Sequence, residues 1–408
     1  MLFFTFVTAF LLVAAAMPTL IQVAKLKNLV DAPGDSRKIH KQSIPTIGGV
    51  MVVLGFMLSA MVWFPAAEGG TFELKWFYML SASLTLFFVG LKDDLIGLSP
   101  AKKLLVHVAL GVLLIHWGGF RIDTFNGLFG LHAIPAWFSY PFSLFVYIVV
   151  VNAVNLIDGI DGLAGGVGTL MMVAFGTWFL MTGNTAPGVL ALAMAGSLVG
   201  FLVFNYHPAK IFMGDCGSLV LGLTAYTMAT EVMNTPSAEI PITWLHISTP
   251  LVAMSILAYP LVDTLRVFTL RAMRGRSPFS PDKNHLHHRI MMCGHNHAQA
   301  ALRLYLYAAS FIALPFVLYF LWPAGNASVL FLAELVVAFV VFLPLLRKTR
   351  FANLRQEAII KEAEAQPTAS AQSQHEGSSR EDDIANGQKS WRKLATVRKP
   401  KKAEGAAV

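Results

Sequence analysis

Residues 137–166 read WFSYPFSLFVYIVVVNAVNLIDGIDGLAGG, and this stretch changes character once along its length. Its first part, 137–153, carries no charged side chain and is mostly apolar. A helix needs about 20 mostly apolar residues to cross a bilayer, so this part predicts a membrane-spanning helix. The second part is rich in Asn, Asp and Gly, which predicts a polar loop at the membrane boundary.

The composition extends this interpretation to the whole chain. It has 408 residues, of which 55% are hydrophobic and 13% charged, with a mean hydropathy of +0.60. Soluble domains carry about 25% charged residues, so lipid is expected to replace water around much of the chain. The predicted fold is an all-α polytopic membrane protein with eleven spanning segments. These segments are 2–24, 47–65, 76–91, 104–118, 137–153, 164–182, 186–204, 217–233, 243–264, 302–322 and 327–346.

Basic residues set the predicted orientation. Lys25 and Lys27 follow the first segment and no basic residue precedes it, which indicates a retained helix rather than a secretory signal. With the N-terminus outside, alternation places five loops and the tail in the cytoplasm, whereas the outer loops hold few basic residues beyond Lys75 and Arg121. Cys216 and Cys293 then face the cytoplasm, so no disulfide is expected. The five loops are 25–46, 92–103, 154–163, 205–216 and 265–301.

The end of the chain differs from the rest. We predict a transmembrane domain over 1–346 and a cytoplasmic tail over 347–408. Most of this tail is Ser, Gln, Ala, Glu and Asp with few apolar residues, which predicts disorder. Its basic run, 393–402, suits either a solvated tail or a contact with anionic lipid. The net charge of +8 is accounted for by such segments, so nucleic acid is not an expected partner.

The loop that ends the opening stretch has a regular polar pattern. Asn152, Asn155, Asp158 and Asp161 recur every three residues, with glycines among them. Residues three apart share a helix face, and glycines let a ligand approach the backbone. No Lys or Arg lies in this loop, so its acids and amides suit a divalent cation and a nucleobase. Oxygen ligands indicate Mg²⁺ or Mn²⁺ rather than zinc. The alternative is a set of helix caps.

A pair of acids ends the third predicted segment. Asp93 and Asp94 follow an apolar run, and Lys102 and Lys103 come soon after. Ionisable groups at membrane depth are functional by default, and adjacent acids raise one another's pKa. The pair therefore suits a proton acceptor or an indirect role at a metal. The alternative is a pair solvated at the interface or neutralised by Lys92.

A third acid stands at the start of another predicted span. Asp215 lies between glycines in FMGDCG, residues 212–217. A metal ligand and a helix N-cap both require an oxygen here, so both interpretations stay open. Phe212 suits either packing or a platform for a nucleobase.

Histidines and basic residues fill the fifth loop. Arg271 lies in its first part, and His285, His287 and His288 follow within four residues of one another. Such a cluster suits zinc, but no Cys or Glu set completes a site. Among Arg and Lys, these histidines are better explained as donors to a diphosphate. The alternative is a solvated basic loop.

These are the groups that phosphoryl-transfer enzymes use: carboxylates that bind Mg²⁺, and Arg or His side chains that donate to the phosphates. A second substrate that arrives from the bilayer explains why the site is built on spanning helices. An ion-coupled transporter is the alternative from another class. It is expected to carry its acids near the midplane, often within internal repeats, whereas here the acids lie at helix ends. A nucleotide-sugar sensor without activity is a second alternative.

The motifs resemble those of the polyprenyl-phosphate N-acetylhexosamine 1-phosphate transferases. This resemblance covers about residues 1–346 and implies eleven spanning helices. The SPFSPD sequence at 277–282 is similar to the branch that uses UDP-N-acetylglucosamine and undecaprenyl phosphate. The branch that transfers phospho-N-acetylmuramoyl-pentapeptide usually has an uninterrupted histidine triplet. The matching motifs are PTIGG (45–49), Asp93-Asp94, NAVNLIDGIDGL (152–163), FMGD (212–215) and HLHH (285–288).

The resemblance also implies a role for each candidate residue. Mg²⁺ is the implied cofactor, with Mn²⁺ as the alternative ion. The implied roles are catalysis beside the lipid phosphate for Asp93 and Asp94, metal ligation for Asp215 and Asn155, nucleotide binding for Asp158, Asp161 and Phe212, and phosphate binding for His285, His287, His288, Arg271 and Lys102.

The implied reaction moves N-acetylglucosamine 1-phosphate from UDP-N-acetylglucosamine to undecaprenyl phosphate and releases UMP. It is expected at the cytoplasmic face of a bacterial inner membrane, where it starts a cell-envelope polysaccharide such as O antigen. Another UDP-N-acetylhexosamine is the alternative donor. Membrane lipid is an expected partner, and a homodimer is compatible with the resemblance. Direct transfer and a covalent enzyme intermediate both satisfy the motifs.

Overall fold

The computed structural model describes residues 1–27, 29–31, 44–67, 73–235, 247–275, 284–322 and 325–340. The tail predicted from residue 347 lies outside the described residues. So do most of the first predicted loop and the SPFSPD sequence.

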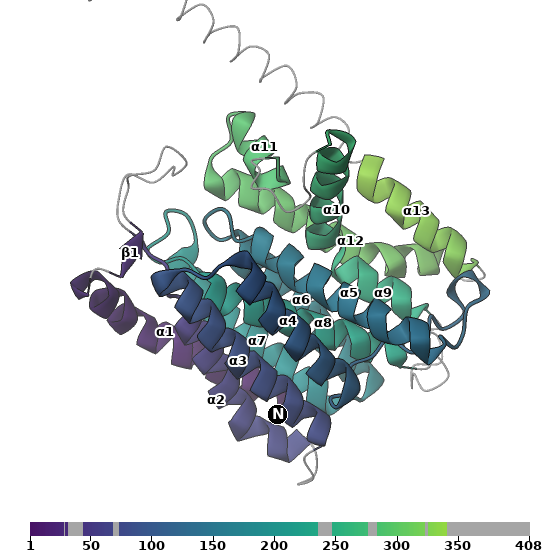
Figure 1. Ribbon diagram of the computed structural model, residues 1–408, viewed down its shortest axis with the longest axis horizontal. Helices are drawn as coiled ribbons and strands as arrows, with labels where there is room; N and C mark the ends of the chain where they lie inside the picture. Colours follow the sequence, from purple (N-terminus) through teal and green to yellow (C-terminus); the bar gives the residue numbers. More distant parts are fainter. Residues whose placement is uncertain are drawn as a thin grey trace, which may run out of the picture. The chain divides into compact units, whose positions relative to one another are not determined.

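The described chain is helical apart from one pair of two-residue strands (Figure 1). Strands β1 (Val30–Asp31) and β2 (Ile44–Pro45) pair antiparallel. The helices are α1 (Leu2–Leu26), α2 (Gly49–Ala67), α3 (Leu74–Ile96), α4 (Pro100–His116), η1 (Leu128–Gly130), α5 (Ala136–Leu156), α6 (Leu163–Thr182), α7 (Thr185–Asn205), α8 (Asp215–Asn234), α9 (Thr249–Ile256), α10 (Ala258–Met273), α11 (Leu286–Met292), α12 (His297–Leu321) and α13 (Ala327–Val340).

Several of these helices are long and apolar enough to cross a membrane. Among the described residues, six qualify by length and composition: α1, α3, α5, α6, α7 and α12. Helices α9 and α10 meet at a 72° bend and together make a seventh. The prediction of a multi-pass helical membrane protein is therefore confirmed. Each predicted segment falls on a helix, but α2, α4, α8 and α13 do not pass the same test, so eleven spans stays a prediction.

Helix α8 shows why a central helix can be less apolar than its neighbours. It packs against α2, α3, α5, α6 and α9, and nearly all its side chains are buried (Figure 1). The hydroxyls of Thr224, Thr227 and Thr230 each donate to a backbone carbonyl of the same helix at 2.9 Å. Such bonds satisfy polar side chains without water. The polar residues of α8 therefore pack inside the bundle.

Glycines bring the chain unusually close to the start of α8. A Cβ on Gly49 of α2 would lie 2.3 Å from the backbone nitrogen of Gly217. A Cβ on Gly90 of α3 would lie 2.6 Å from the carbonyl carbon of Asp215. Small residues permit this kind of close approach between membrane helices. The segment before α8 is also paired with the chain before α2, because Phe212 N–H donates to the Pro45 carbonyl at 2.8 Å.

Gly214, the residue before α8, has the most constrained position of this set. Its φ is +71°, and a Cβ there would lie 2.2 Å from the Thr46 carbonyl oxygen. Gly97 has a similar φ of +76°, but a Cβ there would meet nothing within 4 Å. Substitutions at these two glycines can therefore be compared. Both change a residue with a positive φ, but only the substitution at Gly214 also creates a steric clash.

We predict that Gly214→Ala destabilises the protein more than Gly97→Ala. The left-handed φ costs roughly 1–2 kcal/mol at either position, and only Gly214→Ala adds a clash with the Thr46 carbonyl. Thermal unfolding of both variants in the same detergent measures the difference. Equal losses in the two variants would contradict the tight packing described at the start of α8.

Candidate active site at the start of helix α8

The Asp94 carboxylate caps helix α8 from a neighbouring helix. Its Oδ1 accepts the backbone N–H of Asp215 at 2.8 Å, and its Oδ2 accepts that of Cys216 at 3.0 Å. The N-cap residue itself, Gly214, has no side chain to do this. The first N–H groups of a helix lack partners within the helix, and a negative charge is favourable there. Asp94 therefore fixes the end of α3 against the start of α8.

The side chain of Asp215 is left to make other contacts. Its Oδ1 accepts a hydrogen bond from Asn155 Nδ2 at 2.7 Å, and its Oδ2 contacts the Lys103 ammonium. Asp215 is the first residue of α8, and no side chain of this helix caps it. The N-cap alternative for Asp215 is therefore wrong, because Asp94 provides the cap. Asp215 and Asn155, predicted together as metal ligands, are in direct contact.

Lys103 lies between two carboxylates. Its Nζ is 3.1 Å from Asp93 Oδ2 and also bridges to Asp215. Lys102, which we predicted as the phosphate-binding lysine, is exposed on α4. Lys103 shares the buried face of α4 with His107, and this helical spacing is the signal that distinguishes the two lysines.

Asp158 belongs to the same group of acids. It follows α5, and burial is the main reason that its pKa rises to about 7. The negative charges of Asp215 and Asp94 add to this increase, while a hydrogen bond from the Gly214 backbone opposes it. The loop after α5 therefore places the Asp158 carboxyl group beside the start of α8. A cation that neutralised Asp215 and Asp94 would favour the ionised form of Asp158.

The resulting acid cluster consists of Asp93, Asp94, Asp158 and Asp215. Within the described residues, Lys103 is the one cation that we find in contact with the carboxylates of the acid cluster. Partly buried carboxylates that outnumber their cations are costly. Hard carboxylate oxygens from two helices, with an amide beside them, are the donors that Mg²⁺ and Mn²⁺ prefer. The donor set therefore fits a divalent cation, and the Lys103 ammonium contacts the oxygens that would bind it.

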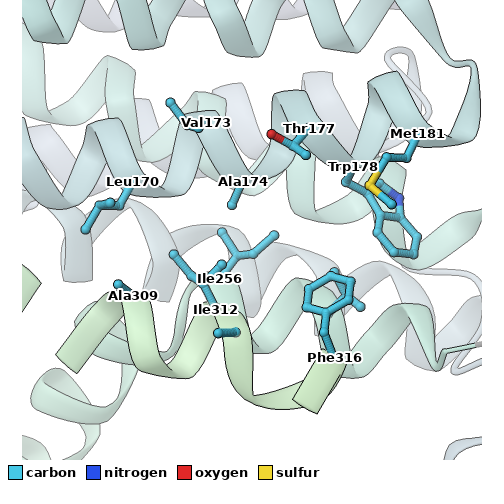
Figure 2. Close-up of a pocket in the computed structure, with 12 residues that line it drawn as sticks. Leu170, Val173, Ala174, Thr177, Trp178, Met181, Ile256, Ala309, Ile312 and Phe316 are labelled. Carbon is cyan, nitrogen blue, oxygen red and sulfur yellow. The ribbon is translucent and has the colours of Figure 1, made fainter. Parts of the chain in front are cut away.

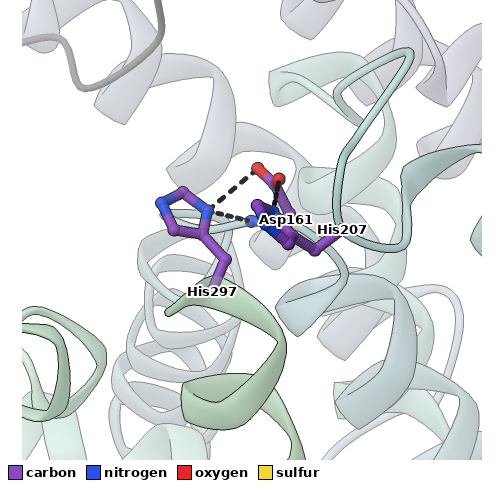
Figure 3. Close-up of side chains that lie close together, drawn as sticks. All are labelled: Asp161, His207 and His297. Carbon is purple, nitrogen blue, oxygen red and sulfur yellow. Dashed lines mark hydrogen bonds and ion pairs between the residues drawn. The ribbon is translucent and has the colours of Figure 1, made fainter. Parts of the chain in front are cut away.

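Asp161 lies in a second cluster with two histidines (Figure 3). Its Oδ2 is 2.7 Å from His207 Nδ1, and its Oδ1 is 3.0 Å from His297 Nδ1. Burial alone would raise the pKa of Asp161, but hydrogen bonds from His297 and His207 outweigh burial and hold that pKa well below its usual range. Sequence reasoning placed Asp161 beside Asp158 on one helix face, whereas the loop after α5 separates them into two clusters. It also assigned no role to His297.

A buried aspartate that sequence reasoning missed organises the histidine motif. Asp263 of α10 accepts the backbone N–H of Leu286, the first residue of α11, at 3.0 Å. It also accepts from Arg266 Nη2 at 2.9 Å and lies 3.1 Å from His285 Nδ1. An acid inside the otherwise apolar segment 243–264 was the available signal. Asp263 thus fixes both His285 and the start of α11.

The three predicted histidines differ in their surroundings. His285 and His287 are buried, whereas His288 is half-buried. Burial lowers the pKa of His287 to about 3, so this ring is neutral at pH 7. A Cβ on Gly159 would lie 2.4 Å from His287 Nε2. This contact joins the histidine motif to the loop that carries Asp158.

The two remaining predicted residues lie outside these contacts. Phe212 is half-buried, and its backbone pairs with the chain before α2. Arg271 is buried near the end of α10, with its guanidinium 6.0 Å from the centre of the Phe268 ring. Their predicted roles with the nucleobase and the phosphates stay predictions.

An apolar pocket of about 300 Å³ lies between α6, α9 and α12 (Figure 2). Leu170, Ile256, Ile312 and Phe316 are among its lining side chains, and none of the acids described above lines it. Such a lining suits hydrocarbon and offers nothing to a diphosphate. This pocket is therefore separate from the two clusters of charged residues described above.

Comparison with known proteins agrees with this arrangement. A family model described as glycosyl transferase family 4 matches residues 76–233, which contain the whole acid cluster. The undecaprenyl-phosphate alpha-N-acetylglucosaminyl 1-phosphate transferase of Escherichia coli strain K12 is 31% identical over 317 residues, which cover 75% of this chain and 79% of that protein.

Relatives from two other bacteria match similar shares of the chain. The probable undecaprenyl-phosphate N-acetylglucosaminyl 1-phosphate transferase of Bacillus subtilis strain 168 is 28% identical, over 74% of this chain and 80% of its own. The decaprenyl-phosphate N-acetylglucosaminephosphotransferase of Mycolicibacterium smegmatis is 31% identical, over 76% of this chain and 81% of its own. The chain therefore belongs to the polyprenyl-phosphate N-acetylhexosamine 1-phosphate transferases, within glycosyl transferase family 4.

Proposed function

We propose that this phosphoglycosyltransferase moves N-acetylglucosamine 1-phosphate from UDP-N-acetylglucosamine to undecaprenyl phosphate. An oxygen of the lipid phosphate forms a bond to the β-phosphorus of the donor. The bond from that phosphorus to the bridging oxygen breaks, and UMP leaves with this oxygen. The products are undecaprenyl-diphosphate-N-acetylglucosamine and UMP. The names of the relatives support both the acceptor and the sugar.

One observation carries this proposal: carboxylates from three separate segments gather at the start of α8, where Lys103 contacts those of Asp93 and Asp215. An ion-coupled transporter is expected to carry its acids near the middle of its spans. Here Asp93 and Asp94 lie at the end of α3, and Asp215 lies at the start of α8. A cluster at helix ends is accessible to a water-soluble nucleotide and to a lipid headgroup at once, which favours an enzyme at the membrane surface.

The fit of the donors makes Mg²⁺ the proposed cofactor. Asp215 and Asp93 would hold it, because both carboxylates contact the Lys103 ammonium. The Asn155 amide would be the third group, because it contacts Asp215. When bound, the ion would neutralise negative charge on the donor diphosphate.

The remaining residues bind and orient the substrates. Both Asp94 oxygens are engaged by backbone N–H groups of α8, so Asp94 acts by positioning Asp215. Asp93 remains the proposed catalytic residue beside the lipid phosphate; its Oδ1 accepts the Leu98 backbone N–H and its Oδ2 contacts Lys103. Lys103 offers its ammonium to a phosphate once a divalent cation occupies the carboxylates. Charge-assisted hydrogen bonds of this type are stronger than neutral ones.

We assign the binding of the UDP-sugar to the loops around the acid cluster. Asp158, Asp161 and Phe212 remain the proposed contacts for the nucleotide. His285, His287, His288, Arg271 and Lys102 remain the proposed contacts for phosphate. The basic loops favour a cytoplasmic orientation of this end of the bundle, in a bacterial inner membrane.

Purified protein should release UMP from UDP-N-acetylglucosamine only when undecaprenyl phosphate and Mg²⁺ are both present. Among UDP-sugars, we expect UDP-N-acetylglucosamine to react fastest, by about tenfold or more, because a site built to bond substrate polar groups discriminates strongly. Chromatography of nucleotides and lipid products measures this. Release of UDP instead of UMP would mean that the sugar moves without its phosphate, and the proposal would fail.

Asp215→Asn tests the metal role. We expect the variant to fold and to lose turnover on the order of 10²–10³-fold, since Asn keeps the shape but lacks the negative charge. The remaining activity should require more Mg²⁺ than the wild type. Asp123→Asn is the matched control, because Asp123 is a half-exposed aspartate paired with Arg121 and lies outside the acid cluster.

The measurement is UMP release as a function of Mg²⁺ concentration, with melting curves for both variants. Ordinary turnover in Asp215→Asn, with an unchanged requirement for Mg²⁺, would remove Asp215 from the site.

A further inference from the structure

Asp161, His207 and His297 come together from three segments that are distant in sequence (Figure 3). Asp161 follows α5, His207 follows α7, and His297 begins α12. One carboxylate oxygen and one ring nitrogen from each histidine all lie within 4.8 Å of one another. We propose that these three side chains form a binding site for a divalent transition-metal ion, for which Zn²⁺ is the best match. This proposal goes beyond the transferase reaction, with whose proposed nucleotide contacts it shares Asp161.

The ligand types select the metal. Two imidazole nitrogens and one carboxylate oxygen suit Zn²⁺, whereas Mg²⁺ prefers oxygen alone. A tetrahedral zinc ion with bonds of about 2.0–2.1 Å holds its ligand atoms roughly 3.3 Å apart. The observed separations are 2.7 Å for His207 Nδ1 and 3.0 Å for His297 Nδ1, each to an oxygen of Asp161. These two separations involve different oxygens of the carboxylate, and the three ligand atoms all lie within 4.8 Å of one another, so the side chains would have to adjust around the ion.

The contacts of His297 provide a second argument. Its Nδ1 lies 3.0 Å from Asp161 Oδ1 and 3.3 Å from the backbone nitrogen of the same residue. His297 is therefore held with the nitrogen that would bind the ion directed at the carboxylate.

The surroundings hold the ligands in place. Asp161 Oδ2 also accepts the backbone N–H of Ala209 at 3.2 Å. The next residue, Gly162, donates its N–H to Asn205 Oδ1 at 3.0 Å, and its carbonyl accepts the Tyr305 hydroxyl at 2.5 Å. Outer contacts of this kind orient metal ligands and raise affinity.

One side of the site is open to solvent. The Asp161 side chain is 2% exposed, whereas that of His207 is 36% exposed. Three protein ligands with one side open leave a position for water, as in many zinc sites. The site therefore combines a buried anion with a path for the ion.

Zinc content of the purified full-length protein tests the proposal. The protein is stripped with a chelator in detergent, reloaded with Zn²⁺ without nucleotide, desalted, and analysed by mass spectrometry for metal per chain. We expect about one zinc per chain in the wild type. His207→Ala and His297→Ala should each weaken zinc binding at least about tenfold. Co²⁺ substitution should give visible absorption bands in the wild type that both variants lack.

Two controls separate this site from its neighbours and from the proposed reaction. His295→Ala removes an exposed histidine two residues before His297, which contacts Arg303 instead of Asp161, and this variant should keep its zinc. Asp215→Asn should also keep zinc while it loses turnover, so failure of the transferase proposal and failure of the zinc proposal give different results.

Melting curves and gel filtration show which variants fold. If His297→Ala does not fold, His207→Ala decides the question, since that side chain is partly exposed. A wild type that retains no more zinc than His207→Ala, or equal loss in His295→Ala, would overturn the proposal and leave a hydrogen-bonded triad only.

Discussion

The carboxylate of Asp94 is the group on which the geometry of the acid cluster depends. It accepts the first two backbone N–H groups of α8, and so replaces the cap that Gly214 cannot supply. These donors lack partners within the helix, and no side chain of α8 itself supplies one. The cap must therefore come from another helix, and this requirement ties α3 to α8. Gly90 and Gly214 make the close approach sterically feasible, and the Asp215 side chain is free to face Asn155 and Lys103.

This arrangement concentrates negative charge where a membrane protein least tolerates it. Four carboxyl groups share the start of α8, and burial, with a further contribution from the charges of Asp215 and Asp94, raises the pKa of Asp158 to about 7. Asn155 is tied to α8 through Asp215 at 2.7 Å and through Ser218 at 2.8 Å, so the end of α5 cannot move away to relieve it. A rigid, over-acidic site gains stability when a cation and a phosphate enter. The same features therefore account for the proposed metal and for the proposed substrate.

Much of this could be predicted from the sequence, because apolar length and the order of the motifs depend on local pattern. The helices and their approximate ends follow from it, whereas the association of Asn155 with Asp215 was implied by the resemblance to the family. Contacts between segments do not. The N-cap interpretation of Asp215 was wrong because the capping group lies 121 residues earlier. Lys103, Asp263 and His297 were missed as site residues because their partners lie on other helices. The count of spans is also open, since α8 is buried in the bundle and carries too few apolar residues to pass the test for spans.

The central claim is that the oxygens contacted by Lys103 are those that bind the divalent cation. Manganese binding to the free protein, measured by electron paramagnetic resonance, tests this claim most directly. If the ammonium and the cation compete for Asp93 and Asp215, Lys103→Met should bind Mn²⁺ more tightly than the wild type. Lys102→Met, which removes the exposed neighbouring lysine, should bind Mn²⁺ as the wild type does. Equal affinities in Lys103→Met and the wild type would contradict the account and place the metal elsewhere.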